Sequence, residues 1–392
     1  MNYSMKIHDA FSRNIKVPFF TPWITKEDKK AVMNALHSTL LTDGPKLHQF
    51  EESFAKFTGA KYAIGVSNAT SALHLSLKAI GIGKGDEVIV PDMTFVATAN
   101  AVVLSGAIPV FADIEKKTMN ISIDSIKKKI SSKTKVILPV HFAGKSCDIS
   151  KINKISKEND LNIIEDCAHA IGTQYNKKHV GNFGSAGCFS FYPTKNITTI
   201  EGGMIITNSK NIAKYVMIAR NHGLTKTLAQ RYSHGKPWEY NIDESGYNYR
   251  LDEIRSALGL SQLKRIKKIN ELRKRKFEYY NKRLKGIIHI ITPTPSLNND
   301  HSHHLYILRV ENKNKKSRDE LFSKLLKYGI RTSVHYKPLH MFTVFSKFKN
   351  NTNDLKNSKQ LYDEIISLPL YPNMLKKHQD IVIDSIIRIM KN

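Results

Sequence analysis

A lysine near the end of a predicted strand is the first residue that could do covalent chemistry. Lys195 closes the sequence Ser-Phe-Tyr-Pro-Thr-Lys, which leaves the apolar run Gly187–Phe191. A lysine held in a dry site beside other cations loses its proton more easily and can then form a Schiff base with a carbonyl group. Lys195 is one of many lysines, so this residue alone identifies no reaction.

Two acidic residues, Glu165 and Asp166, end another apolar run, Asn162–Glu165. A carboxylate buried at a strand end is costly unless a cation or hydrogen-bond donors meet it. A pyridinium nitrogen is one such partner, because the carboxylate keeps the ring protonated and able to accept electrons. A salt bridge or a cap on the next helix explains Asp166 equally well at this point.

Small hydroxyl and amide residues form the segment Ser67–Ser71, between an apolar run at Tyr62–Val66 and a predicted helix containing Leu73 and Leu77. Backbone N–H groups at a helix start can hold a phosphate, and the helix dipole favours the anion. Ordinary helix capping explains the same residues. The segment lacks the Gly-Lys-Ser/Thr of a Walker sequence, which excludes a P-loop nucleoside triphosphatase.

These segments belong to an alternation of short apolar runs and helical stretches. Such a βαβ pattern predicts a mostly parallel sheet with helices on both faces. Ligands of these sheets gather at the carboxyl ends of the strands. The runs are Tyr62–Val66, Glu87–Val90, Ile108–Ala112, Val136–Val140 and Asn162–Glu165.

Two helices precede this pattern. Thr25 and Asp28 form a capping pair ahead of a helix that we expect to end near Ser38. A second helix should follow Gly44-Pro45, with Leu47, Phe50, Phe54 and Phe57 along one face.

The pattern changes after Arg250, where Leu251–Lys285 predicts one long helix. A chain of 392 residues is long for a single core. We therefore expect a cofactor-binding large domain with an N-terminal arm at 1–250. The long linking helix and a small C-terminal α+β domain should occupy 251–392.

Together and in this order, the motifs resemble the DegT-type nucleotide-sugar aminotransferases. The resemblance runs from Val17-Pro18-Phe19 to Leu368–Pro372 and so covers nearly the whole chain. It implies the aspartate aminotransferase fold (fold type I) and pyridoxal 5'-phosphate as the cofactor. Two departures, Ile200 for a frequent Gly and Tyr192 for a frequent His, remove no reacting group.

The resemblance also implies a role for individual residues. Lys195 matches the lysine that holds the cofactor covalently and is catalytic, and Asp166 matches the partner of its ring nitrogen. Arg250 and His335 are the expected substrate contacts. The other expected cofactor contacts are Thr70, Ser71 and Ser190 at the phosphate, Phe95 on the ring face, His169 near the ring oxygen, and Asn248, which reaches the phosphate of a neighbouring subunit.

By the same resemblance, the enzyme is a transaminase that moves an amino group from L-glutamate to a nucleotide-linked keto-sugar. The expected acceptor is a 4-keto-6-deoxyhexose, and the amino sugar serves surface polysaccharide or glycan synthesis. His141–Ser146 and His335–Pro338 favour a UDP-linked N-acetylated sugar. A 3-keto acceptor and a dTDP or GDP carrier stay open. The family also implies a homodimer with shared active sites, and the presence of Lys195 disfavours the branch that performs dehydration.

A net charge of +27 raises the question of nucleic acid. The chain has no zinc-finger spacing and no Arg-Gly-Gly repeat, and an abundance of Asn and Ile indicates a general compositional bias. We expect solvated lysine faces and no nucleic-acid partner. A non-catalytic nucleic-acid-binding or regulatory protein on the same fold is the alternative.

The remaining composition argues against a metal, a membrane span and disulfides. His301, His303 and His304 lack a carboxylate or cysteine at a recognised ligand spacing, so no metal is expected. No run of about 18 apolar residues is present. The three cysteines are an odd number without Cys-x-x-Cys spacing, which favours the cytoplasm.

Overall fold

A seven-stranded sheet forms the centre of the large domain in the computed structural model, which describes residues 14–226, 231, 238–295, 300–311, 317–348 and 352–391. β9 runs antiparallel to both of its neighbours and every other adjacent pair is parallel, so the predicted mostly parallel sheet is confirmed. In spatial order the strands are β1 (Tyr62–Val66), β9 (Gly203–Thr207), β8 (Ala186–Ser190), β5 (Asn162–Asp166), β4 (Thr134–Ile137), β2 (Glu87–Pro91) and β3 (Ile108–Ala112).

One predicted strand ends early. The run Val136–Val140 pairs regularly only as far as Ile137, and Val140 forms an isolated bridge with Asp166. Pro139 lies between them and has no N–H to donate to the ladder. The chain therefore leaves the sheet close to the end of β5.

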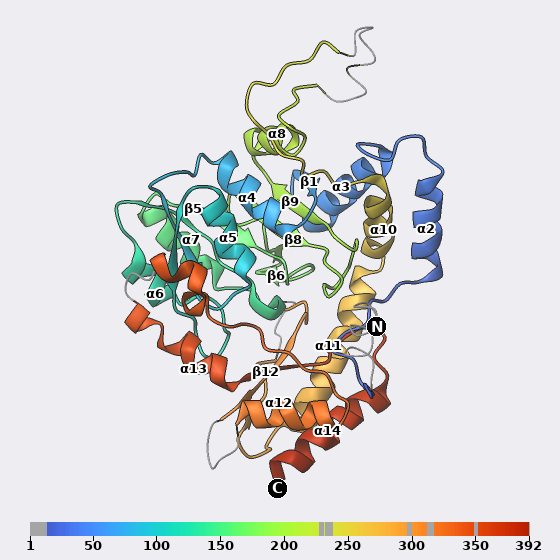
Figure 1. Cartoon of the computed structure of the whole chain (residues 1–392), viewed down its shortest axis with the longest axis vertical. Helices are drawn as coiled ribbons and strands as arrows, with labels where there is room; N and C mark the ends of the chain where they lie inside the picture. Colours follow the sequence, from blue (N-terminus) through green and yellow to red (C-terminus); the bar gives the residue numbers. More distant parts are fainter. Residues whose placement is uncertain are drawn as a thin grey trace, which may run out of the picture.

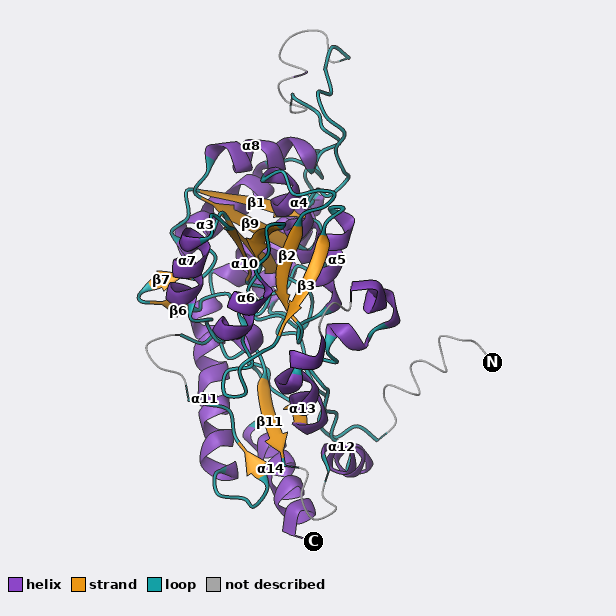
Figure 2. Cartoon of the chain, turned by 90° about the vertical axis from the view of Figure 1, so that its left-hand side faces the viewer, coloured by secondary structure: helices purple, strands orange, loops and turns teal. Residues whose placement is uncertain are grey.

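Helices cover both faces of this sheet (Figure 2). Val88 and Val90 of β2 pack on the side of α4 (Ala69–Ala79) and α5 (Val96–Leu104). Ile89, between them, packs on the opposite side with α7 (Ile149–Glu158). This alternation is the two-residue repeat of a strand buried on both faces. Two further helices of this part are α6 (Ile123–Lys129) and α8 (Lys210–Ala219).

The two expected N-terminal helices are present. Thr25 and Asp28 form the predicted capping box of α2 (Lys26–Leu36). α3 (Pro45–Thr58) buries Leu47, Phe50 and Phe54, and ends at Gly59, whose φ of 73° is left-handed.

The long helix predicted at Leu251–Lys285 is wrong, because two helices replace it: α10 (Glu253–Leu263) and α11 (Ile266–Leu284). At the break, Arg265 forms an ion pair with the buried Asp28, and its guanidinium lies 4.9 Å from the centre of the Trp23 ring. These contacts join the chain to the start of α2, and helical periodicity carries no information about them.

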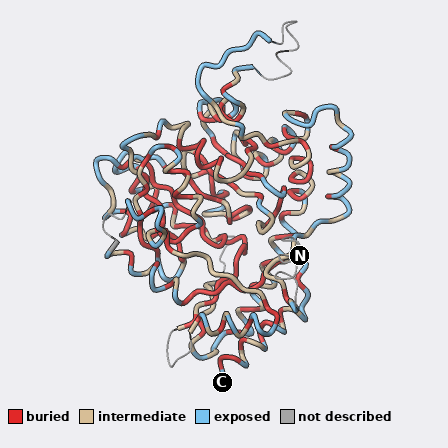
Figure 3. The backbone as a smooth tube through the Cα atoms, viewed as in Figure 1, coloured by how far each residue is buried: buried red, intermediate tan, exposed pale blue. Residues whose placement is uncertain are grey.

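The C-terminal part contains a three-stranded antiparallel sheet of β10 (Ile290–Ile291), β11 (Tyr306–Val310) and β12 (Ile365–Leu368). It packs with α12 (Arg318–Lys327), α14 (Lys376–Lys391) and the second half of α11, from Phe277 onward. Figure 1 shows this C-terminal part below the large sheet. Figure 3 shows buried residues inside the large-sheet part and inside the C-terminal part. α10, in contrast, packs against α2 and α3. The division at 250/251 stays a prediction.

The remaining short elements lie mostly in connections. They are the hairpin of β6 (Gln174–Tyr175) and β7 (Lys178–His179), helix α13 (Lys356–Glu364), and the 3₁₀ turns η1 (Phe142–Gly144), η2 (Leu339–Met341), η3 (Thr343–Phe348) and η4 (Thr352–Asp354). Among the residues described, no helix is both long enough and apolar enough to cross a bilayer.

The start of α3 yields a test of the packing between helices. Its N-cap, Gly44, has no side chain, and the buried carboxylate of Glu253 accepts hydrogen bonds from the N–H groups of Lys46 and Leu47, both at 2.8 Å. We expect Glu253→Ala to lower the free energy of unfolding by about 2 kcal/mol, because it removes a charged cap. Urea denaturation measures this change. Glu271→Ala, at an exposed ion pair on α11, is the control and should change stability by less than about 0.5 kcal/mol.

Candidate active site

A cavity of about 540 Å³ lies at the carboxyl ends of β5 and β8 and beside the start of α4. In Figure 2 the arrows of β2 and β3, which run parallel to β5 and β8 in the same sheet, point toward the C-terminal part of the chain. Three of the predicted site residues, Ser71, Asn248 and Arg250, are not among its lining residues. The structure brings the other seven together in its wall: Thr70, Phe95, Asp166, His169, Ser190, Lys195 and His335.

Asp166 is the buried carboxylate of this cavity. Its Oδ2 accepts a hydrogen bond from Thr98 Oγ1 at 2.9 Å, and its Oδ1 accepts one from the N–H of Ala168 at 3.1 Å. Burial raises the pKa of Asp166, while the two donors and the positive charge of Lys195 oppose that rise. Each oxygen keeps a lone pair for a further donor, so the carboxylate suits a protonated ring nitrogen.

Lys195 lines the same cavity. Burial lowers its pKa to about 8, against the attraction of Asp166, which acts in the opposite direction. The amine can therefore gain or lose a proton near neutral pH, as a proton-transferring group must. Asn196 anchors this loop, since its Nδ2 donates to Asn270 Oδ1 at 2.7 Å and to the carbonyl of Ser302 at 2.8 Å.

The start of α4 fits a phosphate group. The N–H groups of Ala69 and Thr70 stand in the first turn, where they have no partner within the helix, and both residues line the cavity. Gly203 of β9 lies so close that a Cβ there would be 2.5 Å from the carbonyl carbon of Asn68. Thr70 and Ser190 add hydroxyl groups at this end.

Ser71 takes part in capping instead. Its N–H donates to Asn68 Oδ1 at 2.8 Å, and its hydroxyl lies within hydrogen-bond distance of Ser67 Oγ and Asn68 Oδ1. Ser71 is buried, so its hydroxyl orders the start of the helix. A direct contact between Ser71 and the phosphate stays a prediction that no contact of this chain supports.

His169 has a protein partner at each ring nitrogen. Nδ1 accepts from the N–H of Ala143 at 3.3 Å, so the ring proton is on Nε2, which lies 3.1 Å from Tyr336 Oη. Burial lowers the pKa of His169 well below its usual value, which keeps the ring neutral. Sequence reasoning did not assign a role to Tyr336, although this residue follows His335 and lines the cavity.

His335 and Phe95 both line the wall of the cavity. His335 lies with Nδ1 2.8 Å from Ser367 Oγ, and its ring stacks on Phe19 with 5.7 Å between centroids. Burial and the nearby Lys195 lower the pKa of His335 to about 3. Phe95 is 55% exposed at the start of α5, which leaves its ring face open to a ligand.

Two predicted residues lie elsewhere in the chain. Arg250 lines a separate cavity of about 350 Å³ and donates to Asn221 Oδ1 at 2.7 Å. Asn248 is exposed and bridges the backbone of Asn221. Neither residue reaches the Lys195 cavity of its own chain.

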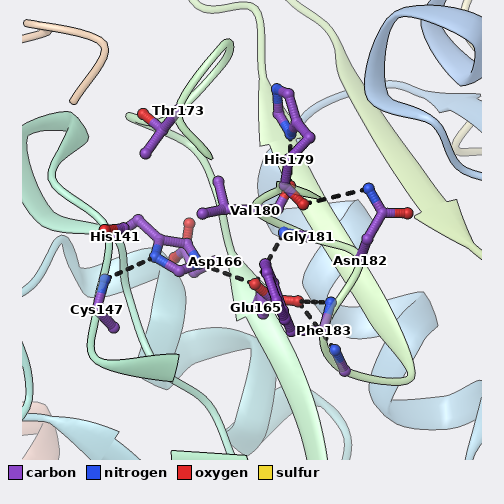
Figure 4. A network of polar contacts seen from close by, with 12 residues as sticks. His141, Cys147, Glu165, Asp166, Thr173, His179, Val180, Gly181, Asn182 and Phe183 are labelled. Carbon is purple, nitrogen blue, oxygen red and sulfur yellow. Dashed lines mark hydrogen bonds and ion pairs between the residues drawn. The ribbon is translucent and has the colours of Figure 1, made fainter. Parts of the chain in front are cut away.

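Behind the sheet, Glu165 points away from the cavity because neighbouring side chains alternate along a strand (Figure 4). His141, Glu165 and Cys167 lie close enough to suggest a metal site. His141 Nδ1 accepts from the N–H of Cys147, however, and Nε2 donates to Glu165 at 3.0 Å, so neither nitrogen has a free lone pair. Burial raises the pKa of Cys167 well above that of a free thiol.

Glu165 is also held by the backbone N–H groups of Gly181, Phe183 and Gly184, at 2.7 to 2.9 Å. Hydrogen bonds thus account for this cluster. Of the three histidines considered for a metal, His301 and His303 stack on each other, and His304 Nδ1 lies 3.2 Å from Asn196 Oδ1.

A lysine of lowered pKa and a buried carboxylate line one cavity at the carboxyl ends of a mostly parallel sheet, and the start of α4 lies beside them. This arrangement fits a pyridoxal-phosphate-dependent enzyme of fold type I. The chain belongs to the DegT/DnrJ/EryC1/StrS aminotransferase family, whose sequence profile matches residues 22–387.

The similar proteins match this chain over nearly their full lengths. The spore coat polysaccharide biosynthesis protein SpsC of Bacillus subtilis (strain 168) is 40% identical over 382 residues, which are 97% of this chain and 98% of that protein. The putative sugar aminotransferase Spr1654 from Streptococcus pneumoniae, in its PMP form, superposes with a TM-score of 0.91 at 30% identity, covering 96% of this chain and 99% of that one. A PLP form of Spr1654 is also similar.

A third relative is Helicobacter pylori PseC, an aminotransferase involved in the biosynthesis of pseudoaminic acid. It has a TM-score of 0.89 at 34% identity, and the match covers 96% of this chain and 99% of that one.

The electrostatics of Lys195 can be tested in cofactor-free protein. An amine-reactive acylating reagent reacts with the neutral amine, so labelling of Lys195 should reach half its maximal rate near pH 8. Asp166→Asn should move this midpoint to lower pH, because the carboxylate stabilises the ammonium form. Mass spectrometry of peptides labelled across a pH series gives both values. A midpoint near the ordinary lysine value of 10.5, or an upward shift in the variant, would contradict the assignment.

Proposed function

We propose that this chain transfers the amino group of L-glutamate to a keto-sugar carried on a nucleoside diphosphate, with a 4-keto-6-deoxyhexose as the acceptor. The observation that carries the proposal is the placement of Lys195 and Asp166 in one cavity whose far end is the start of α4. The amino sugar then enters surface polysaccharide or glycan synthesis, a role supported by the names of SpsC and PseC.

In the proposed site, the start of α4 with Thr70 and Ser190 binds the cofactor phosphate, and Phe95 covers one face of the ring. Pyridoxal phosphate, when bound, supplies an electron-accepting ring. Asp166 holds the proton of the ring nitrogen, which maintains that capacity. His169, which is hydrogen bonded to Tyr336, lines the same cavity and lies near the ring oxygen of the cofactor in this proposal.

Lys195 performs the proton transfers. With the cofactor bound, neutral Nζ of Lys195 would remove a proton from the α-carbon of glutamate and, as the ammonium form, would return a proton later in the transfer. Hydrolysis releases 2-oxoglutarate. The keto-sugar enters next, and the same transfers in reverse give the amino sugar.

Glutamate and the sugar must occupy one pocket in turn. His335 is neutral, so it offers hydrogen bonds without a fixed charge to either substrate. Arg250 is proposed as a substrate contact only through a partner subunit, because it lies outside the cavity of its own chain. The preference for a UDP-linked N-acetylated sugar depends on His335–Pro338 and on His141–Ser146, in which the side chain of His141 faces Glu165 behind the sheet and the centroid of the Phe142 ring lies 6.2 Å from that of the Tyr336 ring.

The high positive charge has a place in this proposal, because it attracts a diphosphate-bearing substrate. We propose action in the cytoplasm, which three buried free cysteines support.

The test is a panel of nucleotide keto-sugars with L-glutamate as donor, read by mass spectrometry of the amine product. We expect turnover with 4-keto-6-deoxy acceptors and none with Lys195→Ala. Turnover confined to 3-keto acceptors would favour the alternative sugar class. Failure of the whole panel, together with salt-dependent binding to duplex DNA, would favour the non-catalytic alternative.

We further propose a homodimer whose two active sites are shared. A phosphate dianion needs several donors, and Ser71 is already used within its helix cap. Asn248 is exposed and precedes Arg250. The described residues 238–245, which come shortly before it, belong to an extension above α8 (Figure 1). Described parts of this extension present apolar side chains to solvent, with Trp238 71% and Ile242 49% exposed. A second copy of the chain would cover them and receive Asn248.

Mixing two inactive variants tests this assembly. Lys195→Ala and Asn248→Asp should each be inactive, the second because its charge repels the phosphate. In a mixed dimer, one site receives both defects and the other site receives none. Each mixed dimer should therefore have about half the activity of a native dimer. Differently tagged chains verify subunit exchange. Mixed dimers without activity, or an active monomer, would disprove the shared site.

A further inference from the structure

The hydroxyl of Thr98 bonds a carboxylate from another element and not the backbone of its own helix. Threonine and serine hydroxyls inside helices commonly bond the carbonyl four residues earlier. Thr58 of α3 does so, donating to the carbonyl of Phe54 at 2.9 Å, and Ser105 at the end of α5 donates to that of Ala101 at 2.8 Å. Thr98, in the first turn of α5, instead donates across the cavity wall to Asp166 Oδ2 at 2.9 Å.

A second threonine fixes the direction of this hydrogen bond. Thr94 Oγ1 lies 2.9 Å from Thr98 Oγ1. Because the proton of Thr98 is donated to the carboxylate, Thr98 accepts the proton of Thr94. Thr94 comes just before Phe95, the N-cap residue of α5, and no side chain caps this helix. The hydroxyl of Thr94 therefore bonds Thr98 and does not cap the helix. Both threonines are at most 2% exposed.

We propose that Thr98, oriented by Thr94, is a positioning residue that keeps Asp166 ionised and directed at the ring nitrogen of the cofactor. The proposal depends on the proposed function for the role of Asp166. Only two hydrogen-bond donors of the protein are recorded on this carboxylate within the described chain, and Thr98 is the only side chain of the two.

The equilibrium between the protonated and ionised forms of Asp166 shows why the Thr98 hydroxyl matters. The ionisable groups that interact with Asp166 are Lys195 and Tyr336 in the cavity, His141 behind β5, and the buried thiols of Cys147, Cys167 and Cys188. Burial favours the protonated acid, whereas Thr98, Ala168 and Lys195 favour the carboxylate. Without Thr98, Asp166 becomes the stronger base, so the proton shared with the ring moves from the ring nitrogen toward the carboxylate. The ring then accepts electrons less well.

The experiment uses holoenzyme reconstituted with pyridoxal phosphate labelled with ¹⁵N in the ring. The ¹⁵N chemical shift reports whether the ring nitrogen carries the proton. In Thr98→Val we expect the equilibrium to move about tenfold toward the neutral ring, the size of one hydrogen bond to a charged group, and kcat to fall by a similar factor. KM for glutamate should change by less than about twofold. Thr98→Ser, which keeps the hydroxyl, should restore both values.

Two other variants separate positioning from packing. Thr94→Val keeps the Thr98 hydroxyl and should give a smaller shift in the same direction; it decides the question if Thr98→Val does not fold. Ser105→Ala removes a hydroxyl from the same helix without touching Asp166 and should leave the ¹⁵N signal unchanged. A native ¹⁵N signal in Thr98→Val, or equal losses in Thr98→Ser and Thr98→Val, would overturn the proposal. The spectrum requires no sugar substrate, so this outcome is independent of the acceptor panel.

Discussion

The burial of two adjacent carboxylates at the end of β5 is the constraint on which the site depends. Glu165 and Asp166 face opposite sides of the sheet, and each needs hydrogen-bond donors that replace the water lost on burial. Glu165 has a full set, with His141 and three backbone N–H groups as donors. Among the described residues, Asp166 accepts hydrogen bonds only from Thr98 and Ala168, which leaves it able to accept more. Glu165 is therefore fully hydrogen bonded within the protein, whereas Asp166, which lines the cavity, can accept a hydrogen bond from a cationic ligand.

The same burial determines the behaviour of Lys195. Desolvation lowers its pKa toward neutrality, while Asp166 prevents a larger fall. A fully paired Asp166 would attract the ammonium less, and an exposed lysine would keep its proton at neutral pH. The compromise places an amine that can exchange protons beside a carboxylate that can hold a ring nitrogen cationic. The burial that is unfavourable for the charges of Lys195 and Asp166 thus also produces the pKa shifts that suit them to catalysis.

The cavity also joins parts of the chain that are distant in sequence. Lys195 follows β8, yet its loop is anchored through Asn196 to Asn270 of α11 and to Ser302. Tyr336, from the C-terminal part, meets His169 across the cavity. Asn196 and Tyr336 therefore connect the cavity with segments that lie far away in the sequence.

Local patterns in the sequence determined much of this protein. Apolar runs located β1 and β3 at their observed bounds, the Thr25–Asp28 spacing located the start of α2, and motif order indicated the family that the comparison with known proteins confirmed. Contacts between distant segments could not be derived in this way. At the break in the predicted helix, Arg265 contacts Asp28 and Trp23, and Ser71 bonds within its cap although the resemblance places it at a phosphate. Sequence periodicity reports which side of an element is apolar, whereas only the tertiary structure decides which distant partner a polar group meets.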